Sequence, residues 1–267
     1  MTATDEPNAE ASEQDGGDTN SPPPNGQRST LSKITHFSSS YRVESLLWLT
    51  RILTIFFSLS YFIFPFGNPV NIYYKALVSN CATSALRLHQ RVPRVSISRE
   101  FLSTVLLEDS AHYLLFSLIF MYNAPVSLAI VPILLFAVLH TSSFTLKFLD
   151  IISSSSLGLL RTAIGFVELQ AVFIFRSIAF GEIFLLPTCV LLVFSGRFSI
   201  FSVFLYYRFL VLRYSSRRNP YTRVAFSELR MQTEFIANHP RCPAVAAQML
   251  RTLIGTALRF APNIPPN

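Results

Sequence analysis

Residues 101–146 constrain the fold of this chain more than any other stretch, because they hold two long apolar runs separated by a short turn. The runs are Phe101–Met121 and Val126–Leu146, and the turn lies at residues 123–125. A helix rises ~1.5 Å per residue, so roughly 20 residues cross the ~30 Å hydrocarbon core of a bilayer. Each run has that length, and the turn leaves no room for a folded soluble loop. The sequence therefore predicts a transmembrane helical hairpin.

The composition favours a membrane protein over a soluble protein with a very apolar core. The chain is 51% hydrophobic and 14% charged, whereas soluble domains carry about 25% charged residues. The cysteines Cys81, Cys189 and Cys242 lack the spacing of a zinc site or a disulfide framework. The first residues have neither the cationic nor the apolar region of a cleaved signal peptide, so we expect the first membrane helix to direct insertion.

Charge divides the chain into three regions. Residues 1–30 hold six acids against one base, whereas residues 31–267 hold 21 bases and nine acids. We expect residues 1–40, rich in Asp, Glu, Gly, Ser and Pro, to form a disordered acidic tail. Residues 41–212 are predicted to form a multi-span membrane domain, and residues 213–267 a basic cytoplasmic tail with amphipathic helices. The predicted fold class is an all-α, polytopic helical membrane protein.

The sequence leaves the number of spans open between three and six. Residues 44–65 are predicted to form the first membrane helix, with Arg51 close enough to one end to reach the head groups. Residues 71–90 are polar for a span and fit an interfacial helix as well as a membrane helix. Residues 166–194 and 198–212 are predicted to form a second hairpin.

Two short basic loops predict the orientation. Residues 87–99 and 213–223 each carry four arginines and no acid, and such loops lie on the cytoplasmic side. Two hairpins between them give an even number of crossings, so we expect both loops and the C-terminus in the cytosol. The side of the N-terminus stays open. Beyond setting topology, the second loop offers candidate contacts to anionic lipid or a partner at Arg213, Arg217, Arg218 and Arg223.

Residues 243–261 predict a basic amphipathic helix at the membrane surface. One face carries the apolar side chains Ala246, Met249, Leu250, Leu253, Ala257 and Phe260. The opposite face carries two arginines among small polar residues. The residues expected to contact the membrane or a partner are Arg251, Leu253, Arg259 and Phe260. The alternative is that this helix docks on the chain's own cytoplasmic segments.

Charged side chains interrupt the apolar segments. Glu108 and His112 lie four residues apart on one helix face, and Asp109 lies about 100° around it. A charge inside a bilayer is costly and faces a partner or water. We therefore expect a polar cluster of Glu108, Asp109, His112, Arg176 and Glu182. Arg176 is the first candidate for the cation that pairs with Glu108 and Asp109, and Arg51 is the other.

Two alternatives stay open for this polar cluster, namely contact with another protein and an ion path or metal site. Pairs of an acid and a histidine bind metals, but no second ligand pair lies nearby in the sequence, so we expect no metal and no cofactor. The chain also carries no Walker loop, Rossmann fingerprint or HExxH motif. We expect no enzymatic activity, and no nucleic-acid partner, because no nucleic-acid-binding module accompanies the bases.

Three blocks of the sequence resemble the transmembrane protein 33 family, which includes pore-membrane proteins of fungi. They are SALRLHQRVP (84–93), LLEDSAHYLLFSLIF (106–120) and YYRFLVLRYSSRRNPY (206–221), within a resemblance from about residue 41 to about residue 262. The resemblance implies residence in the endoplasmic reticulum and nuclear envelope. It also implies work with reticulon-type proteins on tubule shape and with nuclear pore proteins, without enzymatic activity. The family is usually drawn with three spans.

The sequence and the resemblance together predict a non-enzymatic organiser of curved endoplasmic-reticulum and nuclear-envelope membrane. Hairpins occupy unequal areas in the two leaflets, and an interfacial helix adds area to one of them. The alternative function is an ion channel or channel-regulating subunit that uses the charged residues within the membrane.

Overall fold

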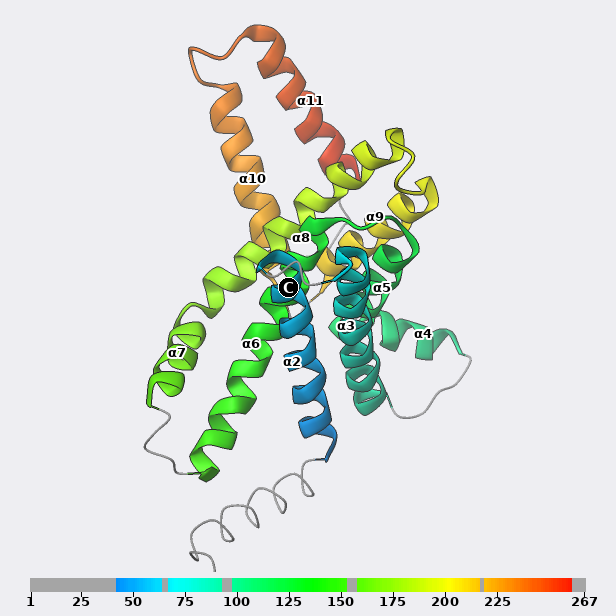
Figure 1. Cartoon of the computed structure of the whole chain (residues 1–267). Coiled ribbons are helices and arrows are strands. Elements are labelled where there is room, and N and C mark those ends of the chain that lie inside the picture. Colours follow the sequence, from blue (N-terminus) through cyan, green and yellow to red (C-terminus); the bar gives the residue numbers. More distant parts are fainter. Residues whose placement is uncertain (1–41, 64–66, 93–97, 153–157, 217–218, 261–267) are drawn as a thin grey trace, which may run out of the picture.

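The computed structural model describes residues 42–63, 67–92, 98–152, 158–216 and 219–260, and every regular element in these ranges is a helix (Figure 1). The helices are α2 Arg42–Ile63, α3 Pro69–Arg91, α4 Arg99–Leu106, α5 Asp109–Tyr122, α6 Ser127–Ile152, α7 Gly158–Leu169, α8 Ala171–Phe194, α9 Ile200–Ser215, α10 Tyr221–Ala237 and α11 Ala244–Phe260. The predicted all-α fold is confirmed. The predicted tail at residues 1–40 lies outside the described residues.

Three of the described helices, α2, α6 and α8, are long and apolar enough to cross a membrane. Helices α4 and α5 qualify together as a fourth span if the bend of 82° between them lies within one crossing. This confirms the polytopic architecture, with a count at the lower end of the predicted range. Helices α3 and α9, which cover the two weakest predicted spans, do not pass the same test of length and composition.

The first arm of the predicted hairpin is not one straight helix. Helix α4 ends at Leu106, and Glu108 stands before α5 in an extended conformation. The expectation of a continuous span over Phe101–Met121 is therefore wrong. Carboxylates are stabilised at a helix N-terminus, where the backbone N–H groups have no intrahelical partner. The acids Glu108 and Asp109 accordingly stand where a new helix begins, not in the middle of an old one.

Helices α2 and α3 lie side by side along a polar seam (Figure 1). Helix α3 begins at Asn68, whose side chain accepts a hydrogen bond from Val70 N, and Pro69 occupies the first turn. The hydroxyls of Thr54 and Ser79 lie 2.9 Å apart. Small polar side chains let two helices approach closely and bond to each other in an apolar environment. This explains why the polar segment 71–90 forms a helix inside the bundle.

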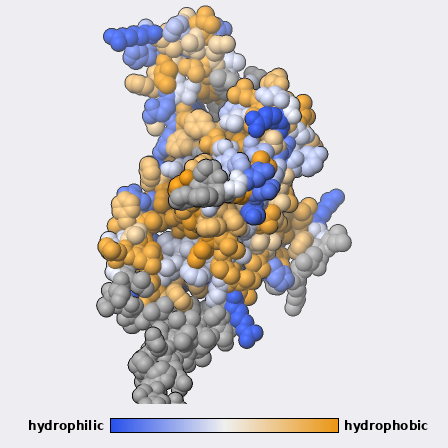
Figure 2. All heavy atoms as spheres, in the orientation of Figure 1, coloured by the Kyte–Doolittle hydropathy of each residue, from blue (hydrophilic) through white to orange (hydrophobic). Residues whose placement is uncertain are grey.

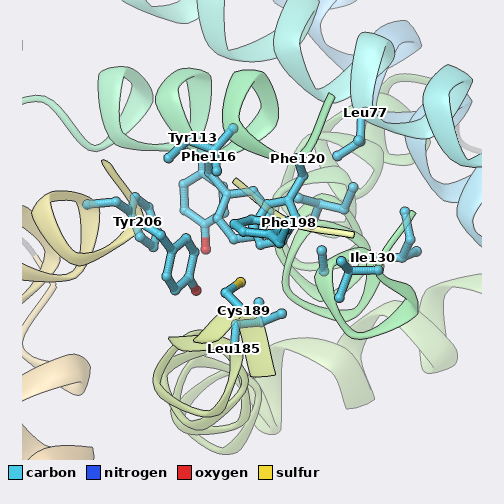
Figure 3. Packing of buried hydrophobic residues seen from close by; sticks show 14 of the residues in the cluster. Leu77, Tyr113, Phe116, Phe120, Ile130, Leu185, Cys189, Phe198 and Tyr206 are labelled. Carbon is cyan, nitrogen blue, oxygen red and sulfur yellow. The ribbon is translucent and has the colours of Figure 1, made fainter. Parts of the chain in front are cut away.

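An aromatic core joins α5 to α9 and α8. Figure 3 shows rings of Phe116, Phe120, Phe198 and Tyr206 close to Leu185 and Cys189 of α8. The ring centroids of Phe116 and Phe120 lie 4.7 Å apart, and those of Phe120 and Tyr206 lie 5.5 Å apart. Aromatic pairs at such distances contribute beyond simple burial. The high phenylalanine content of the chain therefore has a structural use in this core.

One asparagine fixes the register of α5 against α9. The Asn123 amide donates to Ser202 Oγ at 2.8 Å, and its Oδ1 accepts from the backbone N of Ser199 at 2.8 Å. Asn123 follows α5, and both of its partners lie at the start of α9. The two helices are thus antiparallel, so that the end of α9 returns to the start of α5.

Helices α6 and α8 approach each other closely at one glycine. A Cβ atom added to Gly181 would lie 3.4 Å from Cγ of Pro132. The predicted span 166–194 is divided, because residues up to Leu169 belong to α7 and the candidate span is α8 alone. Helix α7 packs on α6. Helix α6 therefore packs directly on α2, α7 and α8.

The C-terminal helices α10 and α11 form a hairpin whose outer end stands away from the other helices (Figure 1). The base of α10 packs on α8, and α11 packs on α10. Figure 2 shows apolar side chains over much of the bundle on the face in view, and hydrophilic ones at the outer end of this hairpin. The predicted boundary at residue 212 falls inside α9, which continues to Ser215.

Candidate functional site

A buried ion pair lies where α8 and α9 meet. The side chains of Arg213 and Glu182 are 1% and 0% exposed, and Arg213 Nε lies 3.1 Å from Glu182 Oε2. Two charges at this depth are stable together only if each finds a partner, because neither has water to solvate it. Arg213 stands in the last turn of α9, where a cation is also favoured by the helix dipole.

Two tyrosine hydroxyls donate hydrogen bonds to Glu182. The hydroxyl of Tyr113 on α5 donates to Glu182 Oε1 at 2.6 Å, so each carboxylate oxygen has its own donor. The hydroxyl of Tyr206 donates to the Glu182 carbonyl at 2.7 Å. The Arg213 guanidinium also lies over the ring of Tyr113, 5.3 Å from its centroid. The pair is therefore held by side chains from α5, α8 and α9.

Asp109 extends this network to the start of α5. Its Oδ1 lies 3.4 Å from Arg213 Nη1 and accepts a hydrogen bond from Ser216 Oγ at 3.0 Å. His112 Nδ1 lies 3.7 Å from the same oxygen, and His112 Nε2 lies 2.7 Å from the Leu106 carbonyl. The histidine thus bridges the bend between α4 and α5. Asp109, His112 and Glu182 form part of one cluster, as the sequence predicted.

Arg176 does not belong to the buried cluster. It pairs with Glu228 of α10 at 2.7 Å, with 46% of its side chain exposed. Glu108 pairs instead with Arg91 of α3 at 2.6 Å. The expected pairing of Arg176 with Glu108 and Asp109 is therefore wrong. Arg176 lies near the start of α8, on the side that faces α10, whereas Glu182 is nearly two turns further along.

Arg213 is the residue that sequence reasoning misplaced. It was expected at the membrane surface, but it is buried in the bundle. The signal was its spacing, since Tyr206, Phe209, Leu210 and Arg213 recur at helical intervals and are all buried. The arginine continues the apolar face of α9, and only the count of bases in the loop suggested the surface.

The other predicted surface residues are scattered or lie outside the description. Arg223 is half-buried on α10, and Arg251 is exposed on α11 and donates to Asn238 Oδ1 at 3.0 Å. Arg217 and Arg218 lie outside the described residues, as do the side chains of Leu253, Arg259 and Phe260. Their predicted contacts to lipid or a partner stay predictions.

The buried cluster is built from groups that mostly satisfy one another. Within the described residues, no group of three or more His, Cys, Asp or Glu side chains is arranged to hold a metal ion. Arg213 Nη2 and His112 Nδ1 are the two buried atoms of the cluster without a hydrogen-bond partner in the described part of the chain. The arrangement ties α5, α8 and α9 together by charge as well as by aromatic packing.

Two cavities lie among α2, α3 and α6, and the first of them adjoins the cluster. The first has a volume of about 420 Å³ and reaches Asp109 and Tyr113, and the second has a volume of about 350 Å³ and reaches Glu44 and Lys147. The residues that line both cavities are Arg51, Arg87, Arg91 and His140. These residues come from α2, α3 and α6, so only the assembled bundle brings them together.

Comparison with known proteins agrees with the resemblance of the three sequence blocks. The chain is 43% identical to Transmembrane protein 33 of Homo sapiens over 91% of this chain and 98% of that protein. It is 44% identical to Krueppel homolog 2 of Drosophila melanogaster, covering 87% of this chain and 83% of the relative. It is 38% identical to the Transmembrane protein 33 homolog of Caenorhabditis elegans, covering 87% of each. No solved structure matches the chain.

The match to the family description is as extensive as the match to single relatives. Residues 26–263 match the family described as Transmembrane protein 33/Nucleoporin POM33. This range contains every described helix, including the charged cluster and both cavities. The chain therefore belongs to the Transmembrane protein 33/Nucleoporin POM33 family.

Proposed function

We propose that this chain is a non-enzymatic organiser of curved membrane in the endoplasmic reticulum and nuclear envelope. Its proposed partners are reticulon-type proteins, nuclear pore proteins and anionic lipids. The family's description names a nucleoporin, and this supports the nuclear pore as one place of action. We also propose that residues 87–99 and the C-terminal region lie in the cytosol, because their arginines favour that side.

The observation that carries this proposal is the apolar surface of the α10–α11 hairpin. Five large apolar side chains are between 53% and 71% exposed on its two helices: Met231, Phe235, Ile236, Val245 and Met249. An apolar patch of this kind marks a surface that binds a membrane or another protein. On a helix beside membrane spans, such side chains enter the head-group region of one leaflet and widen it.

The opposite side of α11 suits the polar side of a membrane surface. Arg251 and Gly255 are exposed there, and Gln248 is exposed one turn earlier. Each base near an anionic surface contributes roughly 1 kcal/mol. The packing of α11 on α10 also agrees with the alternative that the helix docks on the chain itself. In this proposal α10 and α11 enter the interface as one unit.

Reconstitution of the full chain into liposomes tests the proposal. We expect tubules or small vesicles, seen by electron microscopy, without ion flux. Replacing Val245 and Met249 by Asp should abolish this remodelling, because two charges then enter the head-group boundary. The matched control replaces Gln248 and Gly255 by Asp on the polar side of the same helix and should keep most of it. Equal loss in both variants would contradict a role of the apolar face.

Conductance measurements on the same liposomes distinguish the channel alternative from the proposed function. An ion conductance that is abolished by Glu108→Gln with Asp109→Asn would favour a channel. The engagement of these carboxylates by Arg91, Arg213 and Ser216 supports a structural role for them instead.

A further inference from the structure

The two cavities beside the buried cluster carry more positive charge than their surroundings compensate. Arg51, Arg87, Arg91 and Lys147 line them, against the carboxylates Glu44 and Asp109. Arg91 is already paired with Glu108, and Asp109 with Arg213. None of Arg51, Arg87 and Lys147 forms an ion pair with another described residue. Arg213 is also the counter-charge of Glu182, so with Glu44 included five bases stand against four carboxylates, and one positive charge stays uncompensated.

Among these bases, Arg51 gives the strongest evidence for a missing hydrogen-bond acceptor. It is 8% exposed and lines both cavities. Within the described residues its guanidinium makes one hydrogen bond, from Nη1 to the His140 carbonyl at the long distance of 3.5 Å. A buried guanidinium has five donors and is stable only when anionic or polar acceptors meet them. Its position therefore indicates an acceptor that the described part of the chain does not supply.

We propose that the two cavities together bind the phosphate monoester of an anionic lipid headgroup. Such a group carries about −1.5 to −2 charges at pH 7 and so supplies the negative charge that the two cavities lack. Arginine forks bind phosphate oxygens in pairs, and Arg51 and Arg87 offer two forks from facing helices. Both cavity volumes lie in the range of ~300–1,000 Å³ that is usual for small-molecule sites.

The location favours a lipid over a phosphate from solution. The second cavity lies between the first turns of α2 and the last turns of α3 and α6, and both α2 and α6 are candidate spans. On the outer side of α2, Leu46 and Leu49 are 45% and 49% exposed and suit contact with acyl chains. Arg51 and the α2–α3 hydroxyls lie further in. A lipid can thus enter with its phosphate between the helices and its chains along α2.

The test is native mass spectrometry of the full chain in detergent, titrated with phosphatidic acid or with phosphatidylcholine of the same acyl chains. We expect phosphatidic acid to bind roughly tenfold more tightly, because each charged hydrogen bond contributes strongly. Arg51→Gln with Arg87→Gln should remove this preference. The matched control, Arg197→Gln with Arg208→Gln, changes two exposed arginines outside the cavities and should keep it. Equal binding of the two lipids by the unaltered chain would overturn the proposal.

A third variant avoids any change to the interior. Lys147 is exposed at the second cavity, so Lys147→Gln should leave the fold intact and weaken phosphatidic acid binding about threefold. Unchanged binding in both Lys147→Gln and the Arg51/Arg87 double variant would refute the site. Displacement of the lipid by inorganic phosphate at low millimolar concentration would refute the lipid as its source. The inference does not rest on the α10–α11 hairpin, so a failure of liposome remodelling leaves it standing.

Discussion

Arg213 and Arg51 are both buried arginines in the same bundle, but their neighbours differ. Arg213 lies within 3.4 Å of two carboxylates and over an aromatic ring. Among the residues that the structure describes, Arg51 makes a single long hydrogen bond, to a backbone carbonyl, and it lies beside cavities that hold further arginines. Burial alone therefore does not define the role of a charge in a membrane protein. The first arginine completes the protein's interior, whereas the second leaves it open to a ligand.

The largest expected effect on stability comes from removing the counter-charge of Arg213. Glu182→Gln removes the main counter-charge of a fully buried guanidinium, and we expect a loss of about 3–5 kcal/mol in the free energy of unfolding. Unfolding of the purified chain by SDS, followed by circular dichroism, measures it. Adding Arg213→Met to Glu182→Gln should recover much of the loss. Strict additivity of the two changes would count against a direct pair.

The next effect concerns the contact between α8, which carries Glu182, and α6, which lines both cavities. Gly181→Leu forces a side chain against Pro132, so α6 must move from α8, at an expected cost of about 1–3 kcal/mol. The same unfolding assay measures the loss, and weaker phosphatidic acid binding should accompany it because α6 lines both cavities. Gly165→Leu on α7 is the control, since a Cβ atom there meets nothing within 4 Å. A similar loss in the control would count against the Pro132 contact as the cause, because Gly→Leu by itself favours a helix.

Removing the charge of Arg51 is expected to have a smaller effect on stability, and one of opposite sign. In lipid-free detergent, Arg51→Gln should change the free energy of unfolding by about 1 kcal/mol or less, and towards stabilisation. The reason is that an uncompensated cation leaves the interior and no ion pair is lost. A loss as large as that of Glu182→Gln would mean that Arg51 has an equally important partner in the chain. Added phosphatidic acid is expected to stabilise the unaltered chain more than the Arg51→Gln variant, because a ligand stabilises the form that binds it more tightly.

The smallest effect is expected at Arg176. Its pair with Glu228 is partly exposed, so solvent screens it, and Arg176→Gln should cost about 0.5 kcal/mol or less. The comparison uses SDS unfolding side by side with Glu182→Gln. A loss of several kcal/mol would contradict the assignment of Arg176 to the surface, and would bring back its predicted role as the buried cation.

Much of the fold was predictable because long apolar runs have few alternatives. The spans α2, α6 and α8, the helix at residues 71–90 and the helix near residues 243–261 all follow from length and periodicity. The bend before Glu108 did not follow, since the composition on its two sides is similar. What fixes it is the placement of Glu108 against Arg91 and of His112 against the Leu106 carbonyl, and neither contact is visible in a hydropathy pattern.

The charged residues were predicted better as a set than as pairs. Asp109, His112 and Glu182 do share one cluster, because a charged group within a membrane is stable only beside a partner or water. The cation among them was misidentified, since its choice depends on which helix packs beside α5, and the linear sequence does not specify this. The cavities were not predictable either. Arg51 and His140 are 89 residues apart and meet only through the packing of α2 on α6.

The shortness of α5 and α9 has a consequence for the bilayer itself. At ~1.5 Å per residue, the 14 residues of α5 rise about 21 Å, and the 16 residues of α9 rise about 24 Å. The register set by Asn123 prevents them from sliding apart to cover more depth. Lipid beside this pair must thin by several ångströms to match it, and thinning costs less in the ~27 Å bilayer of the endoplasmic reticulum than in the thicker plasma membrane.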